Sequence, residues 1–379
     1  MVDDAATDRG LVEPAELFVN RPAFAGSKRC PGRGRLQVND RVLADCYSKE
    51  EKMLNRRNFL SRALSSALLP LGAALRPRTA SASSSSLSLQ EGESAQADWT
   101  RDSRWGSDYW RRNEQSVELP NKARVACLCS IPFESYDPVE GPAEDSAAIS
   151  NIYYGGKVGV WRILEILDRH NVKGNFVTNA LCAVQFPEAV QAIAGRGHEI
   201  VGHFWANNIR EDQLTGERDR GLIRRSLSTL EQVTGQRPVS WVAPGWWAGP
   251  KTLDILAEEG LTSHANSPSI DDLPYTVTIA GKKIVVIIQE TVLNDNGFFN
   301  NFNGPSTFVE YLKRDFDRKY AEAAKRPKIF NFVLHAHLGG RPFMAEALDE
   351  ILSYVQSFPD VWFTVRQPLV NWWLERGYR

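Results

Sequence analysis

The sequence lacks two features that would assign a function class at once. Its 45 Lys and Arg residues balance 46 Asp and Glu residues, leaving a net charge of −1. No basic excess therefore indicates a nucleic-acid partner. The apolar run at residues 63–75 is shorter than the roughly 20 residues that a membrane-spanning helix needs, so the sequence predicts no stable membrane anchor. The chain also contains no internal repeat.

Cysteine is scarce, with 5 in the whole chain. From residue 83 onward there are Cys127, Cys129 and Cys182. Cys127 and Cys129 lie two positions apart on an expected strand, so their side chains face the same way and are poorly placed for a mutual disulfide. We interpret all three as small apolar core residues.

The N-terminal part divides into three segments. Residues 1–52 are polar and lack periodicity, as in a disordered segment or an over-extended gene start. Residues 53–82 hold Arg56 and Arg57, the apolar run and a small-x-small site, which is the layout of a secretory signal peptide of twin-arginine type. A basic amphipathic helix is the alternative interpretation. Residues 83–123 are expected to form a linker and a tryptophan-containing arm.

The signal peptide predicts a partner and a location. We expect the twin-arginine export machinery of a bacterium to carry the chain, which would then be periplasmic or secreted. Such export delivers folded proteins, and a cofactor inserted in the cytoplasm is a frequent reason for it.

From residue 124 onward, apolar stretches of strand length alternate with helical patterns. This alternation predicts an α/β fold with a parallel sheet and right-handed crossovers. The hairpin expected at residues 275–279 and 282–288 interrupts it. The other expected strands cover residues 124–131, 174–178, 199–202, 239–242, 328–335 and 361–365. The expected helices cover residues 158–170, 187–196, 219–234, 250–259, 306–325, 344–357 and 368–376.

Polar groups follow four of these apolar runs. Glu134 ends the first strand, His203 follows the third, and His335 and His337 follow the strand near residue 334. The loop at residues 243–247 holds two tryptophans. Because the carboxyl ends of parallel strands meet at one edge, these groups are expected to converge there.

Four segments carry a resemblance to a known family: VACLCSIPFE (125–134), GHEIVGHFWAN (197–207), VAPGWW (242–247) and LHAHLGGRP (334–342). Together they resemble the polysaccharide deacetylase (NodB homology) family. The branch with peptidoglycan deacetylase-like proteins, cyclic imide hydrolases and metal-independent allantoinases is the most similar. The resemblance implies that residues 124–379 form a distorted (β/α) barrel of the NodB deacetylase type.

The resemblance also implies a mechanism. Family members typically hold a divalent metal through an acidic residue and two histidines, and a C-terminal histidine protonates the leaving amine. Glu134 and His203 match ligand positions, and Glu134 and His335 are the expected catalytic acid and base groups. Asn207 stands at the second histidine ligand and Pro132 at the usual aspartate base. These two departures predict a weakly held zinc, or none.

Three further positions leave alternatives open. His337 could replace the missing ligand, or it could be a second-shell histidine. Asp137, Glu144 or Asp145 could supply the base, although loop carboxylates are usually solvated. We expect burial among tryptophans to raise the pKa of Glu134.

Aromatic residues at the expected mouth indicate the substrate. Trp205, Trp246 and Trp247, with Pro244, are expected to form a platform for a sugar ring or a flat cyclic amide. Arg341 could orient a substrate carboxylate or carbonyl, or it could form a salt bridge within its loop. The expected function is an exported hydrolase of non-peptide C–N bonds, most simply an N-deacetylase of amino sugars or polysaccharide. A metal-independent cyclic amide hydrolase and a catalytically degenerate glycan-binding protein are the alternatives.

Overall fold

The computed structural model describes residues 114–379, except residues 142, 144, 247, 268 and 300–303. The predicted signal peptide, the segment before it and the tryptophans of the expected arm lie outside the described residues. The chain divides into Met1–Gln90 and Glu91–Arg379, and every described residue belongs to the second unit. In that described part, no helix combines the length and apolar character needed to cross a membrane.

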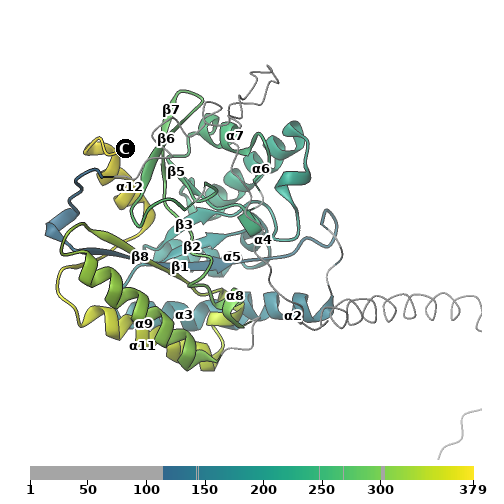
Figure 1. Cartoon of the computed structure of the whole chain (residues 1–379). Helices are drawn as coiled ribbons and strands as arrows, with labels where there is room; N and C mark the ends of the chain where they lie inside the picture. Colours follow the sequence, from purple (N-terminus) through teal and green to yellow (C-terminus); the bar gives the residue numbers. More distant parts are fainter. Residues whose placement is uncertain (1–113, 142, 144, 247, 268, 300–303) are drawn as a thin grey trace, which may run out of the picture. The chain divides into compact units, whose positions relative to one another are not determined.

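One curled sheet organises the described unit (Figure 1). Its strands follow the order β6-β7-β5-β4-β3-β2-β1-β8, with β9 paired to β1. The pairing is parallel except between β6 and β7, which form the predicted hairpin. A parallel bridge between Asn294 and Val333 joins the chain beyond β7 to β8 and so continues the curl. The predicted α/β fold of the NodB barrel type is confirmed.

The strand bounds agree with the prediction to within a few residues, but one strand was missed. The strands are β1 (Val125–Phe133), β2 (Asn175–Thr178), β3 (Glu199–Gly202), β4 (Ser240–Trp241), β5 (Ser263–His264), β6 (Tyr275–Ile279), β7 (Lys282–Val286), β8 (Lys328–Val333) and β9 (Val361–Phe363). β5 is only two residues long, too short to give a periodic signal.

The predicted helices are present, with four short ones added. They are α2 (Ser146–Tyr154), α3 (Val160–Arg169), α4 (Ala180–Gln185), α5 (Pro187–Gly195), α6 (Gly216–Thr234), α7 (Thr252–Glu258), α8 (Asp295–Phe299), α9 (Pro305–Glu322), α10 (Ala336–Gly339), α11 (Pro342–Gln356) and α12 (Arg366–Glu375). Of these, α2, α4, α8 and α10 were not predicted. Figure 1 shows α3, α9 and α11 side by side along one flank of the sheet.

The core explains where the polar residues emerge. All nine residues of β1 are buried, as expected for a central parallel strand covered on both faces. Cys127, Cys129 and Cys182 are buried free cysteines, which confirms their interpretation as core residues. Glu134, directly after β1, is therefore the first ionisable group that this strand delivers to the carboxyl edge of the sheet.

Candidate active site

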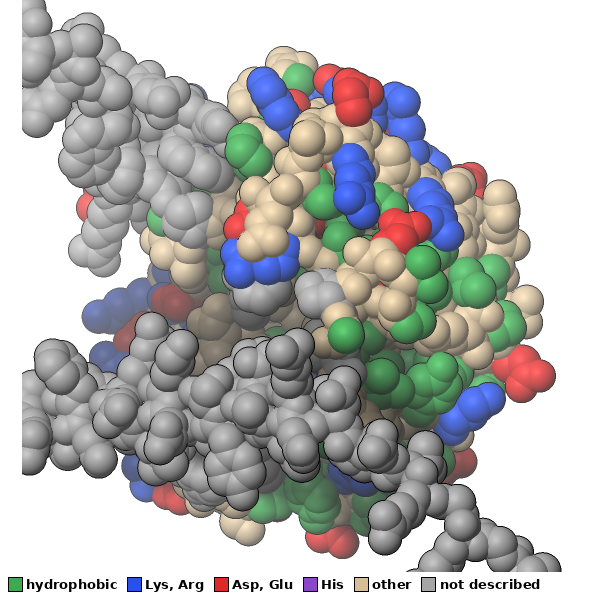
Figure 2. All heavy atoms as spheres, turned by 90° about the vertical axis from the view of Figure 1, so that its right-hand side faces the viewer, with side chains coloured by type: hydrophobic (Ala, Val, Ile, Leu, Met, Phe, Trp, Pro, Cys, Tyr) green, Lys and Arg blue, Asp and Glu red, His purple; other side chains and the backbone are tan. Residues whose placement is uncertain are grey.

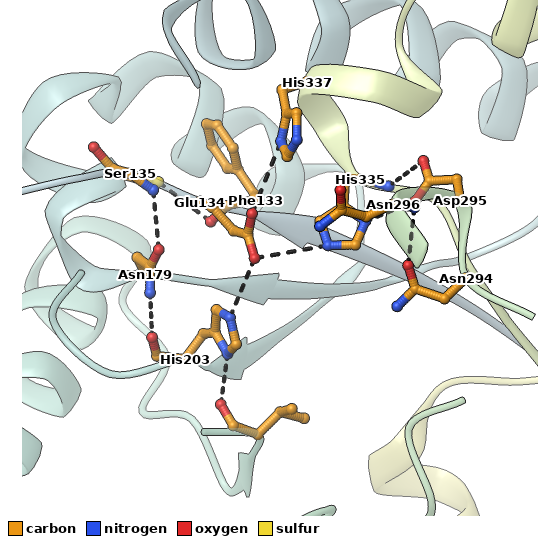
Figure 3. A network of polar contacts seen from close by, with 12 residues as sticks. Phe133, Glu134, Ser135, Asn179, His203, Asn294, Asp295, Asn296, His335 and His337 are labelled. Carbon is orange, nitrogen blue, oxygen red and sulfur yellow. Dashed lines mark hydrogen bonds and ion pairs between the residues drawn. The ribbon is translucent and has the colours of Figure 1, made fainter. Parts of the chain in front are cut away.

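Glu134 lies at the centre of a cluster of three histidines, shown in Figure 3. Its Oε1 atom lies 3.5 Å from His203 Nε2 and 3.7 Å from His335 Nε2. Its Oε2 atom lies 3.8 Å from His337 Nδ1. The Glu134 side chain is 8% exposed, so these imidazoles, more than water, determine its electrostatic environment. The structure thus brings together the four ionisable groups expected to converge.

His335 is held by a carboxylate that the sequence did not reveal. Its Nδ1 atom lies 2.6 Å from Asp295 Oδ1, and its backbone N–H donates to Asp295 Oδ2 at 2.8 Å. Asp295 is fully buried at the start of α8. This pair of contacts fixes the imidazole plane and directs Nε2 toward Glu134.

His203 is oriented in a similar way, but by a backbone carbonyl. Its Nδ1 atom lies 2.6 Å from the carbonyl oxygen of Val242, which can only accept, so Nδ1 carries a proton. The Asn179 side chain donates to the carbonyl oxygen of His203. These two contacts hold the ring so that its Nε2 atom faces Glu134 Oε1.

His337 reaches the cluster through close backbone packing. It lies on the short helix α10, which packs against the helical turn at residues 155–159. A Cβ atom on Gly159 or Gly340 would collide with the backbone opposite, so glycine at both positions permits this approach. His337 Nδ1 is buried without a hydrogen-bond partner among the described residues.

The cluster reverses the expected shift in the pKa of Glu134. Burial does raise this pKa, but the charge on His335 and the hydrogen bond from His203, with smaller contributions from the other histidines, lower it to about 2. The prediction of a raised value was wrong because it considered apolar neighbours and not the imidazoles. Burial lowers the pKa of His335, but Asp295 and Glu134 outweigh it and raise the value to about 9. At neutral pH the site holds an ionised acid beside a protonated imidazole.

The donor set fits a divalent metal only in part. Glu134 Oε1 and His203 Nε2 are separated by a distance that one shared cation could bridge. However, no group of three or more His, Cys, Asp and Glu side chains within the described ranges is placed to hold a metal ion. The Asn207 amide stands where the family has an imidazole, and its Oδ1 is buried without a hydrogen-bond partner from the described residues. The charged His335 also competes for the same carboxylate oxygen. These residues do not fit a tightly held zinc.

A pocket of about 540 Å³ opens over the cluster. Side-chain amides dominate its polar lining, and one guanidinium joins them. The lining includes Glu134, His203, His335, Asn207, Asn208, Gln289, Asn294, Asn296 and Arg210. Figure 2 shows basic and acidic side chains interspersed on one face of the molecule, without a block of one sign. The amide-rich lining of the pocket suits a polar substrate.

Several residues expected at the mouth lie elsewhere. Trp205 does not line this pocket: it is 4% exposed, donates from Nε1 to Asp137 Oδ2 at 2.6 Å and stacks under Arg225. Pro244 is buried between two lining residues, Ala243 and Gly245. The side chains of Trp246 and Trp247 lie outside the described part.

Arg341 and the loop carboxylates also lie away from the cluster. Arg341 donates to Asn151 Oδ1 at 2.9 Å and lies over the ring of Tyr154, so it ties α10 to α2. Asp137 accepts from Trp205 and from the backbone of its own loop, and Asp145 caps α2. None of these three lines the pocket over Glu134, and Glu144, the remaining candidate base, lies outside the described residues.

The functional residues that sequence reasoning missed are Asp295 and Gln289. Both follow the apolar run of β7, in the stretch QETVLNDN (289–296). Polar residues after an apolar strand were the signal used for Glu134 and His203, so the same rule could have found them. They were missed because β7 was treated as a peripheral hairpin, whereas it lies within the curled sheet.

The chain is similar to known proteins of the polysaccharide deacetylase family. The sequence model of the polysaccharide deacetylase family matches residues 151–264. The structure of the Puue allantoinase is 29% identical with a TM-score of 0.64, over 69% of this chain and 94% of that one. A probable polysaccharide deacetylase from Pseudomonas aeruginosa PAO1 is also 29% identical with a TM-score of 0.64, over 70% of this chain and 97% of that one.

A curated relative from Helicobacter pylori, named peptidoglycan deacetylase, is 23% identical over 131 residues. That similarity covers 35% of this chain and 44% of the relative, so the chain matches less than half of its length. The family match, the two structures and the strand-end cluster agree with one another. The chain therefore carries a polysaccharide deacetylase domain of the NodB type, from a family of hydrolases that act on carbon–nitrogen bonds other than peptide bonds.

Proposed function

We propose that this domain hydrolyses an N-acyl bond of an amino sugar or polysaccharide by acid and base catalysis, with a weakly held metal or none. The observation that carries the proposal is the pairing of Glu134 with His335 at 3.7 Å on the pocket floor. One group is ionised and the other is protonated at neutral pH. A scissile amide bound above them would have a proton acceptor and a proton donor within reach.

The step we propose uses only groups of this chain and a water molecule. The water oxygen attacks the acyl carbon while its proton passes toward Glu134. The C–N bond then breaks as His335 Nε2 delivers a proton to the nitrogen, giving an acid and an amine. The low pKa keeps Glu134 ionised but makes it a weaker base than a solvated carboxylate. Asp295 keeps the imidazole charged and directed.

A second candidate function is hydrolysis of a small cyclic amide. Two observations favour it: Asn207 and Pro132 replace the expected ligand and base, and the allantoinase structure is as similar as the deacetylase structure. Side-chain amides around the pocket can pair with the carbonyl and N–H groups of a flat ring.

A substrate screen tests the proposal and separates the candidates. The chain would be assayed on chitotetraose, peptidoglycan fragments, allantoin and succinimide, with release of acetate or ring opening as the readout. Acetate release supports the deacetylase, and ring opening supports the cyclic amide hydrolase. If no compound reacts but chitotetraose binds, the domain is a glycan-binding protein and the proposal fails.

Export through the twin-arginine machinery remains part of the proposal, because its signal lies outside the described residues. Changing Arg56 and Arg57 to Lys should retain the protein in the cytoplasm of a bacterial host. Normal export of this double variant, or a mature N-terminus far upstream of Ala82, would contradict it.

A further inference from the structure

Gln289 has an unusual position for a pocket residue because a buried arginine controls its orientation. It follows β7 at the carboxyl edge of the sheet, is 3% exposed and lines the pocket over Glu134. Behind it lies Arg366, the first residue of α12, which is fully buried. Arg366 donates from Nη2 to Gln289 Oε1 at 2.8 Å.

The arginine itself is held from several sides. Its Nη1 atom donates to the carbonyl oxygen of Ile287 at 2.9 Å, and its backbone N–H donates to Asn175 Oδ1 at 2.7 Å. The charge of Glu199 is also close, and that carboxylate accepts from the backbone N–H of Gln367 at 2.7 Å. Arg366 is therefore a fixed group and not a mobile side chain.

This contact decides which end of the Gln289 amide faces the pocket. A guanidinium carries only donors, so the amide oxygen must face Arg366 and the Nε2 group must face away. Among the described residues Nε2 has no hydrogen-bond partner, and it is not among the atoms sealed from solvent. The structure thus presents a fixed N–H donor to the space above Glu134.

We infer that Gln289 is a specificity-determining residue whose Nε2 donates to an acceptor oxygen of the substrate, with Arg366 as its positioning residue. This inference takes from the proposed function that the pocket over Glu134 is the substrate site. The contact itself does not depend on whether the substrate is hydrolysed. Two sources of acceptor oxygen share this chemistry: a carbonyl, as on a cyclic amide, and a hydroxyl, as on a sugar ring. A compound that has neither a carbonyl nor a hydroxyl oxygen at this position should bind weakly.

Binding to a catalytically inert background tests the contact without requiring turnover. Glu134→Gln and Glu134→Gln/Gln289→Met would be titrated with chitotetraose, allantoin and succinimide by calorimetry. Methionine keeps the length of glutamine but removes the donor, so affinity for the preferred probe should fall roughly 5- to 30-fold. Gln356→Met, the same change at an exposed position on α11, is the matched control and should not alter affinity.

Gln289→Glu distinguishes the two sources. A glutamate would pair with Arg366 and direct an acceptor oxygen into the pocket. A substrate hydroxyl can donate to that oxygen, so a sugar should keep its affinity for the Gln289→Glu variant. A substrate carbonyl cannot donate, so a cyclic amide should bind the Gln289→Glu variant more weakly than it binds the Gln289→Met variant.

Steady-state kinetics test the role of Arg366 in positioning Gln289. On any hydrolysed probe, Gln289→Met should raise KM more than it lowers kcat, because the contact holds the substrate and not the reacting atoms. Arg366→Lys, which releases the amide to rotate, should raise KM in wild type but add little in Gln289→Met. If the lysine variant does not fold, the Gln289 variants still decide the question.

Equal affinity of the two Glu134→Gln proteins for every probe, including absence of binding by both, overturns the inference. That result differs from failure of the proposed function. A probe that binds and loses affinity on Gln289→Met without ever being hydrolysed would leave the contact standing and remove the enzyme.

Discussion

Two buried glutamates in this molecule have opposite electrostatic surroundings. Glu134 lies among three histidines, which lower its pKa to about 2 against the effect of burial. Glu211 is 1% exposed and lies beside another carboxylate, Asp219, so burial and then the charge of Asp219 raise its pKa well above the usual value. Burial alone thus does not determine ionisation; the sign of the neighbouring charges does.

The two environments also have different structural consequences. Thr252 donates to Asp219 at 2.8 Å and lies 3.3 Å from Glu211. Glu211 Oε1 and Asp219 Oδ1 are buried and have no hydrogen-bond partner in the part of the chain that the structure describes. Through Thr252, the acid pair joins the loop that follows His203 and the helix α6 to the start of α7. Two ionised carboxylates would repel each other here, and the raised pKa of Glu211 reduces that repulsion. In the histidine cluster the neighbouring charges lower the pKa of the glutamate, whereas in the acid pair the neighbouring charge raises it.

We expect the largest effect from a variant that removes the charge at the centre of the histidine cluster. Glu134→Gln keeps the shape of the side chain but removes the proton acceptor, so kcat should fall by roughly a hundredfold to ten-thousandfold. Circular dichroism should show the fold unchanged, and the control Glu165→Gln, on the exposed face of α3, should keep full activity. Turnover within a few-fold of wild type would remove Glu134 from the mechanism.

The second prediction concerns the partner of His335. Asp295→Asn removes one of the two carboxylates that raise the pKa of His335 to about 9 against the effect of burial. A general acid works in its protonated form, so wild-type activity should decline as pH rises through about 9, and the variant should decline closer to the ordinary value near 6.5. At pH 8 we expect a loss of activity on the order of tenfold or more.

A matched pair on the surface provides the control for this prediction. His170 Nε2 lies 2.6 Å from Asp349 Oδ1, the same length as the pair in the site. Asp349→Asn should therefore leave the pH profile unchanged. If the activity of Asp295→Asn declines at the same alkaline pH as that of wild type, another group donates the proton.

The contrast between Glu134 and Asp295 shows how far the sequence could predict this molecule. Alternation of apolar runs gave the sheet and most helices, and the rule that polar groups follow strands placed Glu134, His203 and His335 together. Asp295 comes 40 residues before its partner His335, at the start of a helix too short to give a periodic signal, and only the curl of the sheet brings the two together.

The direction in which a side chain points was the second property that the sequence could not predict. Trp205 was assigned to the mouth because it follows His203, yet it turns into the core to reach Asp137. The pKa of Glu134 was misjudged for the same reason, since its shift depends on three imidazoles from two other strand ends. Local pattern predicts which residues reach the edge of the sheet, and packing decides which of them face one another.

The third prediction sharpens the contrast by adding a ligand to the histidine cluster. Asn207 lines the pocket with Glu134 and His203, and its Oδ1 has no partner. Asn207→His should strengthen zinc binding by about tenfold or more, because imidazole is the better ligand. Calorimetry with zinc measures it, and Asn371→His, on the exposed side of α12, controls for the added histidine. Unchanged affinity would show that residue 207 does not face the same point as Glu134 and His203. A wild type that keeps zinc through dialysis against chelator would show that His337 or another group completes the site.

The smallest expected effect tests the acid pair. Because the folded pKa of Glu211 is raised, the unfolded chain ionises first as pH rises while the folded protein stays neutral. The contribution to stability is therefore fully present below the ordinary glutamate pKa and is lost as pH rises through the folded pKa. Glu211→Gln cannot ionise, so its stability relative to wild type should increase from pH 5 to pH 9, by about 1.4 kcal/mol per unit of displaced pKa.

Urea unfolding at pH 5, 7 and 9 measures this difference. Glu258→Gln is the opposite control: Glu258 pairs with Arg220 at the surface, and the hydrogen bond from Arg220 lowers its pKa. That contribution is present above the ordinary pKa and lost as pH falls, so removing it should never increase stability toward alkaline pH. If Glu211→Gln shows the same pH dependence as wild type, the pair already ionises in the folded protein. The opposition between the two buried glutamates would then disappear, because both would be charged at neutral pH.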